Sequence, residues 1–155
     1  MSPKDPAERV AASNRRASHD YEILERIEAG IRLTGSEVKS LRGGRASLAE
    51  AFARIREGEA WLEGMHIPPY EQGQTKGYDP IRPRKLLLHR REIERLLGKT
   101  KEQGLALIPM RVYFTHGLAK VEIGLGKGRR EHEKRQSIAK REAEREMERA
   151  AGRRR

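Results

Sequence analysis

The segment VEIGLGKGRREHEKR at 121–135 most constrains how this chain can fold, because regular apolar alternation stops inside it. Val121, Ile123 and Leu125 alternate with charged or glycine positions, as in a strand with one buried face. From Gly126 to Arg155 the chain carries 12 lysines and arginines against 6 acidic residues, and it has little apolar surface to bury. We therefore predict a flexible N-terminal arm over 1–13, a folded domain over 14–125 and a basic tail over 126–155.

The composition restricts the classes of function that this chain can have. Its 34 lysines and arginines exceed its 23 acidic residues by 11, and a domain this basic usually binds a polyanion, most often nucleic acid. The chain contains no cysteine, which excludes disulfides and thiolate metal sites. Apolar runs fall short of the roughly 18 residues of a membrane helix, and the N-terminus lacks the apolar core of a secretion signal. We expect a cytoplasmic monomer that contacts no membrane.

Alternating apolar positions predict that most of the domain is strand. Gly30 indicates a bulge or bend in the first strand, and Pro109 indicates a bulge or an edge position in a later one. Trp61 is interpreted as a core residue rather than a platform for base stacking. The expected strands are Tyr21–Thr34, a hairpin of Glu50–Arg56 and Ala60–Ile67 around Glu57–Glu59, and a hairpin of Leu105–Phe114 and Leu118–Leu125.

Two short helices interrupt this pattern. One follows Ser36 as its N-cap and stops at Gly43 and Gly44. The other is predicted over Leu86–Gln103, interrupted near Gly98, after a loop over Tyr70–Pro83. The sum is a mainly β (α+β) fold: a small, partly open, OB-fold-like antiparallel barrel of five to six strands with two to three short helices.

The tail has helical propensity but only a thin apolar stripe, formed by Ala139, Ala143, Met147 and Ala150. Such a helix has little to bury, so we expect it to be disordered alone and helical against a polyanion. The glycines at 124, 126 and 128 are interpreted as a flexible exit from the last strand, because no phosphate-loop context surrounds them.

Catalytic and metal-binding patterns are not found in the sequence. The histidines at 19, 66, 89, 116 and 132 lack metal-ligand spacing, so we expect neither a metal nor another cofactor. His132 lies between two glutamates, but a tail without support cannot preorganise acid–base chemistry, so solvation or RNA contact is favoured. Basic residues at 82–85 and 90–91 fit a phosphate-binding edge or a solvated helix face equally well. We expect no enzyme activity.

Several stretches, in this order along the chain, together resemble the SsrA-binding protein family, SmpB. They are NRRASHDY (14–21), EAGIRLTGSEVKSLRGGRASL (28–48), GEAWLEGMHIPPY (58–70), DPIRPRKLLLHRREIERL (79–96) and AKVEIGLGKGRREHEKR (119–135). The resemblance implies an OB-fold that binds the tRNA-like domain of tmRNA (SsrA RNA). It also implies entry into the A site of a stalled ribosome, where the protein replaces the missing codon–anticodon arm. The tail then probes the empty decoding centre and mRNA channel, and elongation factor Tu with alanyl-tmRNA is an indirect partner.

The resemblance also implies particular site residues. Lysine and arginine members can neutralise phosphates, and Leu87 can contact an unstacked base. Glu37 and Leu87 have alternative interpretations, as a helix cap and a core residue. The tmRNA-facing set is Asn14, Arg16, His19, Glu28, Glu37, Lys39, Leu87 and Lys120. The ribosome-contacting set is Lys127, Arg129, Arg130, His132, Glu133, Lys134, Arg135, Lys140, Arg141 and Arg145.

Two other classes of protein compete with this interpretation. A ribosomal or general OB-type RNA-binding protein would share the charge and the barrel, but not the pair of motifs GSEVKSLR and KLLLHRREI. An RNA nuclease would need a clustered set of acidic or histidine residues, and the sequence shows no such cluster. The motif pair favours the tmRNA-binding family.

Overall fold

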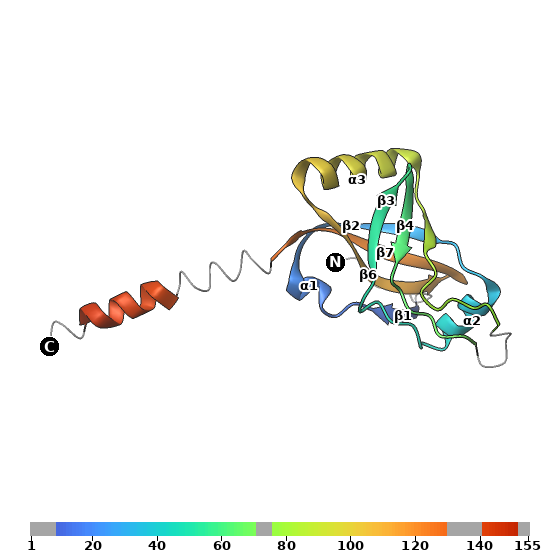
Figure 1. Ribbon diagram of the computed structural model, residues 1–155, viewed down its shortest axis with the longest axis horizontal. Coiled ribbons are helices and arrows are strands. Elements are labelled where there is room, and N and C mark those ends of the chain that lie inside the picture. Colours follow the sequence, from blue (N-terminus) through green and yellow to red (C-terminus); the bar gives the residue numbers. More distant parts are fainter. Residues whose placement is uncertain (1–8, 71–75, 130–140, 152–155) are drawn as a thin grey trace.

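The structure is a computed structural model, which describes residues 9–70, 76–129 and 141–151. Its strands and helices follow one another through the barrel, and a further helical stretch over 141–151 lies in the tail (Figure 1). The elements are β1 (Arg9–Ser13), α1 (Ala17–Asp20), β2 (Tyr21–Ile31), α2 (Gly35–Arg42), β3 (Phe52–Arg56), β4 (Glu59–Glu63), β5 (Arg84–Leu87), α3 (Arg90–Gln103), β6 (Ala106–Thr115) and β7 (Leu118–Gly128).

Six antiparallel strands close into a barrel. Their order is β6-β3-β4-β5-β2-β7, and β7 pairs back with β6. Two joints are thin, because β3 meets β6 at the single pair Ala53–Leu107 and β2 meets β5 at two pairs. The predicted small OB-like antiparallel barrel is confirmed. β1 adds a seventh strand, which pairs with β6 at Arg111–Phe114, beyond the single pair that β6 forms with β3, and which the sequence interpretation did not include.

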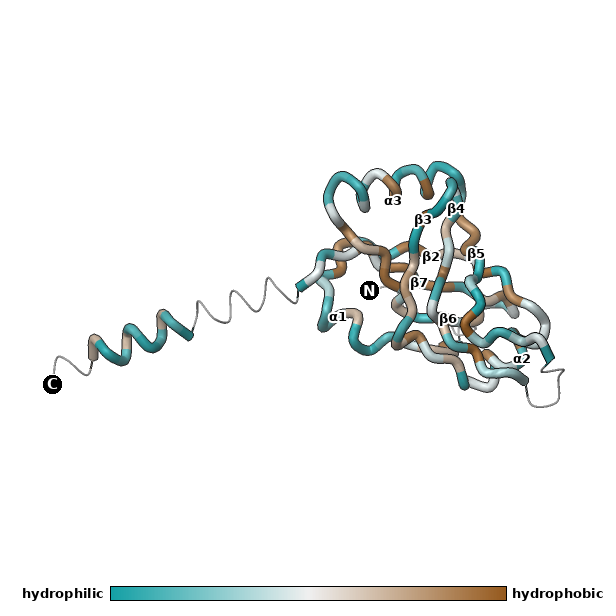
Figure 2. The backbone as a smooth tube through the Cα atoms, viewed as in Figure 1, coloured by the Kyte–Doolittle hydropathy of each residue, from teal (hydrophilic) through white to brown (hydrophobic). Residues whose placement is uncertain are grey.

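The barrel interior and two helices share one apolar core. Leu62, Val112 and Val121 from the strands are fully buried, and Leu41 of α2 and Leu96 of α3 join them. Figure 1 shows α3 above the strands and α2 at the lower side. Burying each such side chain contributes roughly 1.5–3 kcal/mol. In Figure 2 the apolar stretches gather in the strands, while the helical part of the tail is mostly polar.

The folded domain extends beyond the predicted range of 14–125 at both ends. Residues 9–13 form β1 rather than a flexible arm, and they pair with β6 from Arg9–Phe114 onwards. Residues 1–8 lie outside the described part of the chain. At the other end, β7 continues to Gly128, and the Arg129 N–H donates to the Asp20 carbonyl at 2.8 Å. The folded unit therefore extends to residue 129.

Three glycines have different roles from those expected. Gly124 and Gly126 are not a flexible exit, because both pair within the sheet. A Cβ on Gly124 would lie 3.0 Å from Met110 Sδ, and one on Gly126 would lie 3.0 Å from Ile108 Cδ1. They are glycines because side chains from β6 and Ile23 of β2 occupy that space. Of the bulge or bend expected at Gly30, the bulge is wrong, because the register shift of β2 against β7 lies between Ile23 and Glu25.

The helix ends also differ from the prediction. Thr34, not Ser36, caps α2: its hydroxyl accepts from the Glu37 N–H at 3.2 Å, and Glu37 Oε1 accepts from the Thr34 N–H at 2.8 Å. This reciprocal pair is a capping box. The helix ends at Gly43, as expected. The second helix, α3, begins only at Arg90, because 84–87 is strand, and it continues through Gly98 without interruption.

The described part of the tail, residues 141–151, is helical, and every residue in it is exposed. Met147, from the thin apolar stripe, is 72% exposed. The helix therefore has the lack of buried surface that its sequence indicated. Folding of the tail upon ribosome binding stays a prediction.

Candidate RNA interface

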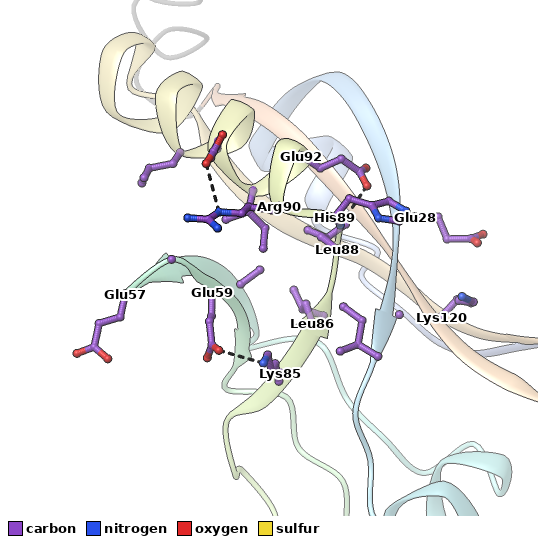
Figure 3. A pocket seen from close by; sticks show the side chains of 17 residues that line it. Glu28, Glu57, Glu59, Lys85, Leu86, Leu88, His89, Arg90, Glu92 and Lys120 are labelled. Carbon is purple, nitrogen blue, oxygen red and sulfur yellow. Dashed lines mark hydrogen bonds and ion pairs between the residues drawn. The ribbon is translucent and has the colours of Figure 1, made fainter.

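A cleft of about 820 Å³ opens where β2, β5, β7, the β3–β4 turn and the start of α3 meet. We call it the Glu28 cleft. Figure 3 shows Glu28 and Lys120 on one side of it, and Glu57 and Glu59 on the other. Lys85, inside the cleft, donates to Glu59 Oε1 at 3.0 Å. One wall thus carries a carboxylate and an ammonium group, and on the opposite rim Glu57 and Glu59 add two carboxylates.

Gly30 brings three of the predicted RNA-facing residues together. It is the position where β2 pairs on one edge with Leu87 of β5 and on the other with Lys120 of β7. Glu28 lies two residues earlier, on the same face of β2. A Cβ on Gly30 would lie 3.1 Å from Leu87 Cβ, so glycine permits this close approach. Glu28, Leu87 and Lys120, distant in sequence, therefore line one cleft.

Leu87 is a surface residue, 47% exposed, so its alternative interpretation as a core residue is wrong. Strand alternation explains this. Leu86 points into the barrel at 2% exposure, and its neighbour must then point outward into the cleft. A large exposed apolar side chain beside Lys120 is suited to contact the face of an unstacked base.

Other members of the predicted set line a second groove, of about 690 Å³. It contains Asn14 and Arg16, together with the exposed ring of Phe52. The Asn14 side-chain amide donates to the Pro109 carbonyl at 3.1 Å, which holds the start of α1 against β6. His19, also on α1, is exposed and contacts Asp20 at 3.2 Å. Asn14 and Arg16 thus lie on a different surface from Glu28, Leu87 and Lys120.

Glu37 is buried at 1% exposure, so the prediction that it faces RNA is wrong and its interpretation as a cap is confirmed. Arg84 Nε donates to Glu37 Oε2 at 2.6 Å, and Arg82 donates to Oε1 at 2.5 Å. Burial acts to raise the pKa of Glu37. The hydrogen bonds from Arg82, the Thr34 N–H and Arg84 outweigh burial, so the pKa is lowered from its ordinary value of 4.5.

Lys39, two residues further along α2, is exposed. Its ammonium group lies 5.6 Å from the centre of the Tyr70 ring, a cation–π distance. The lysine therefore belongs to neither groove, and it remains available on the surface of α2.

Several basic residues near the clefts were assigned less clearly from the sequence. Arg84 is fully buried, so it cannot form a phosphate-binding edge, whereas Arg82 pairs with Glu37 and its side chain stays 40% exposed. Lys85 and Arg90 do line the Glu28 cleft, as does His89 at the N-cap of α3. The spacing of His89 and Glu92 is that of a capping box and could have located this helix start.

Trp61 is partly exposed on the outer face of β4, and it is absent from the buried cores of the described chain. The Arg56 guanidinium lies 5.2 Å from the centre of the tryptophan ring. Its interpretation as a core residue is therefore wrong, because Ala60 and Leu62 on either side occupy the inward positions.

The predicted ribosome-contacting residues are only partly within the described chain. Lys127 and Arg129 lie at the end of β7, and Arg141 and Arg145 lie on the exposed tail helix. Arg130, His132, Glu133, Lys134, Arg135 and Lys140 lie outside the described residues.

Two further findings concern the described residues as a whole. They contain no group of three histidine, aspartate or glutamate side chains that could hold a metal ion. Their helices are also too short or too polar for any of them to span a membrane.

Comparisons with known proteins match nearly the whole chain to one family. The profile of the family described as "SmpB protein" matches residues 11–153. The chain is 60% identical over 152 residues to the SsrA-binding protein of Salinispora arenicola, covering 98% of this chain and 96% of the relative. It is also 60% identical over 144 residues to that of Desulforudis audaxviator, covering 93% and 94%.

A solved structure shares this fold as well. It is described as "tmRNA-SmpB: a journey to the center of the bacterial ribosome", with 54% sequence identity and a TM-score of 0.63. The match covers 76% of this chain and 82% of the chain in that structure. On the profile, the relatives and the shared fold together, the chain belongs to the SmpB protein family.

Proposed function

We propose that this protein is an RNA-binding ribosome rescue factor that binds the tRNA-like domain of tmRNA through its barrel. The observation that carries the proposal is the meeting of Glu28, Leu87 and Lys120 in one cleft. These residues match family positions expected to face tmRNA, and three different strands bring them together. The names of the relatives and of the solved complex support the same RNA.

The chemistry of the Glu28 cleft suits a folded RNA with unstacked bases. The Lys120 ammonium group neutralises a backbone phosphate, and Leu87 packs against the face of a base. The Glu28 carboxylate accepts hydrogen bonds from base amino groups or 2′-hydroxyls. Backbone phosphates have no such donors and are not recognised by it. Phosphate contact supplies affinity, and the carboxylate selects for exposed donors. Binding, not catalysis, is the activity.

The second half of the proposal concerns the ribosome. The protein delivers tmRNA to the A site of a stalled ribosome in the cytoplasm and takes the place of the missing codon–anticodon arm. Its tail, which includes Arg141 and Arg145, probes the empty decoding centre and the mRNA channel. Elongation factor Tu accompanies alanyl-tmRNA in this delivery. The exposed helix over 141–151, in a basic tail, supports a tail that is free to bind RNA.

The first experiment compares binding of the full chain to tmRNA, bulk tRNA and ribosomal RNA at physiological salt. Because non-specific RNA binding is mostly electrostatic, salt must be fixed across the three measurements. We expect clear preference for tmRNA. Equal affinities for the three RNAs would reject the proposal.

The second experiment separates the barrel from the tail. Truncation after Arg129 retains the whole of β7 and the hydrogen bond to the Asp20 carbonyl. We expect this variant to bind tmRNA almost as tightly as the full chain but to fail in tagging on stalled ribosomes. Loss of tmRNA binding by this variant would show that the barrel alone does not bind tmRNA, and would refute the assignment of tmRNA binding to the barrel and ribosome contact to the tail.

A further inference from the structure

We propose that Tyr113 is a positioning residue for RNA binding, because its hydroxyl orients the Glu28 carboxylate in the cleft. The Tyr113 hydroxyl donates to Glu28 Oε2. Tyr113 is 3% exposed, whereas Glu28 is an exposed residue. A buried donor therefore holds one oxygen of a surface carboxylate, and the second oxygen is a further acceptor for RNA. This inference rests on the proposed function, since it concerns the same cleft.

The register of the sheet makes this contact possible. Tyr113 of β6 pairs with Lys120 of β7, and Lys120 in turn pairs with Gly30 of β2. Glu28, two residues before Gly30, lies on the same face of β2, so the tyrosine reaches it diagonally across β7. Glu28 itself pairs with Glu122, in the cross-strand row next to the one that carries Lys120 and Tyr113.

The Tyr113 ring is itself held in place. The Arg111 guanidinium lies 4.3 Å from the centre of the ring. Arg111 Nε lies 3.2 Å from Glu122 Oε2, and Arg26 donates to Glu122 Oε1 at 2.9 Å. These contacts run from β2 through β7 to β6. They fix the direction from which the hydroxyl approaches Glu28.

A long side chain loses rotamer freedom when a ligand immobilises it, and this loss weakens binding. A carboxylate that is already fixed before binding avoids the loss and therefore binds more tightly than a free one. A phenol is also a suitable neighbour, since it donates a hydrogen bond without adding charge. The second carboxylate oxygen of Glu28 therefore keeps its acceptor capacity for base amino groups. Without the hydroxyl, the same carboxylate must be ordered at the moment of binding.

The test is a double-mutant cycle in the full chain, with the transcribed tRNA-like domain of tmRNA as the probe. We expect Tyr113→Phe to weaken binding about fivefold, the loss of one modest hydrogen bond, and Glu28→Ala, which removes the acceptor, to weaken it about tenfold. The double variant should bind no more weakly than Glu28→Ala alone, because Tyr113 acts through Glu28. Additive losses, or wild-type affinity of Tyr113→Phe, would overturn the inference.

A matched control is Tyr78→Phe, which removes a hydroxyl that donates to the Ile67 carbonyl at 2.7 Å, away from the cleft. We expect it to keep wild-type affinity for the RNA. The salt dependence of binding is a second readout. Tyr113→Phe removes no charge, so the slope of log Kd against log salt should stay unchanged. A reduced slope would show that Lys120 has been displaced, and would contradict a role through Glu28.

The Glu28→Asp variant keeps the inference testable if Tyr113→Phe unfolds. Its shorter side chain should lose the Tyr113 contact and about fivefold in affinity, and a wild-type affinity would count against the inference. Failure of the proposed function gives a different result. There, the unmutated protein itself would bind the tRNA-like domain no better than bulk tRNA.

Discussion

Glu28 and Glu37 are the same side chain in two contrasting regions of the molecule. Glu37 lies inside the fold, where Arg82, Arg84 and the Thr34 N–H occupy its oxygens. Glu28 lies on the surface of the cleft, where Tyr113, a neutral donor, holds one oxygen. A buried charge needs matched partners, so Glu37 has nothing left to offer RNA. An exposed carboxylate held by a neutral donor keeps its capacity to bind.

The buried region, which we call the Glu37 cluster, consists of Glu37, Arg82 and Arg84. Arg84 is fully buried and also donates to the Met65 carbonyl at 2.6 Å and to the Pro80 carbonyl at 3.1 Å. The cluster therefore ties α2 to β5 and to the chain that precedes β5. Because β5 carries Leu87 into the cleft, the cluster supports RNA binding only through the fold.

The largest expected effect comes from Glu37→Gln. It leaves the buried Arg84 guanidinium without its counter-charge, and breaking a buried pair in this way costs about 3–5 kcal/mol of unfolding free energy. Urea denaturation measures the loss. The matched control is Glu28→Gln, which should change stability by less than about 0.5 kcal/mol because Glu28 is on the surface. Equal stability of the two variants would remove the contrast between the regions.

Acid should weaken the Glu37 cluster without any mutation. The folded-state pKa of Glu37 is lowered from 4.5, so the unfolded chain binds a proton more readily. The stabilising contribution of Glu37 is thus fully present above pH 4.5 and is lost as the pH falls through the lowered folded-state pKa. Urea midpoints measured over this acid range should fall less steeply with pH in Glu37→Gln than in the unmutated protein. Identical pH dependences would exclude Glu37 as the group responsible.

In the Glu28 cleft the expected effects are on affinity, not on stability. Lys120→Met keeps most of the apolar stem but removes the charge. We expect about five- to tenfold weaker binding of tmRNA and a salt slope reduced by about one. Lys127→Met, further along β7 and exposed, is the matched control and should leave both quantities unchanged. A similar loss of affinity from both variants would mean that a positive charge anywhere on β7 contributes equally to tmRNA binding.

Local patterns were enough to predict much of the barrel. β2 and the hairpins β3–β4 and β6–β7 have period-two alternation or clear turn residues, which depend on neighbours in sequence. β1 and β5 were missed for a physical reason. β5 has only four residues, RKLL, and its two leucines belong to a short apolar run next to a helix, which does not distinguish strand from helix. β1 is short, and only its long-range pairing with β6 makes it a strand.

The candidate site was predictable only in part. Glu28, Leu87 and Lys120 came from family resemblance, but their meeting depends on Gly30 pairing with both β5 and β7. The contact of Tyr113 with Glu28 could not be found from the sequence, because the hairpin turn places Tyr113 opposite Lys120 but its reach to Glu28 depends on the pairing of β7 with β2. The burial of Glu37 likewise needs Arg84, which lies 47 residues away along the chain.

The smallest expected effect compares two neighbouring residues of β5, the buried Leu86 and the exposed Leu87. Leu87→Ala removes an exposed side chain from the cleft, so unfolding free energy should change by less than about 0.5 kcal/mol. Affinity for the tRNA-like domain should fall about threefold, because only part of one apolar contact to a base is lost. The matched variant Leu86→Ala cuts a core side chain at 2% exposure and should lose about 2–5 kcal/mol of stability. The folded fraction of Leu86→Ala should still bind RNA with the wild-type affinity. If Leu87→Ala were the less stable variant, or if it bound RNA as tightly as the unmutated chain, Leu87 would belong to the fold and not to the interface.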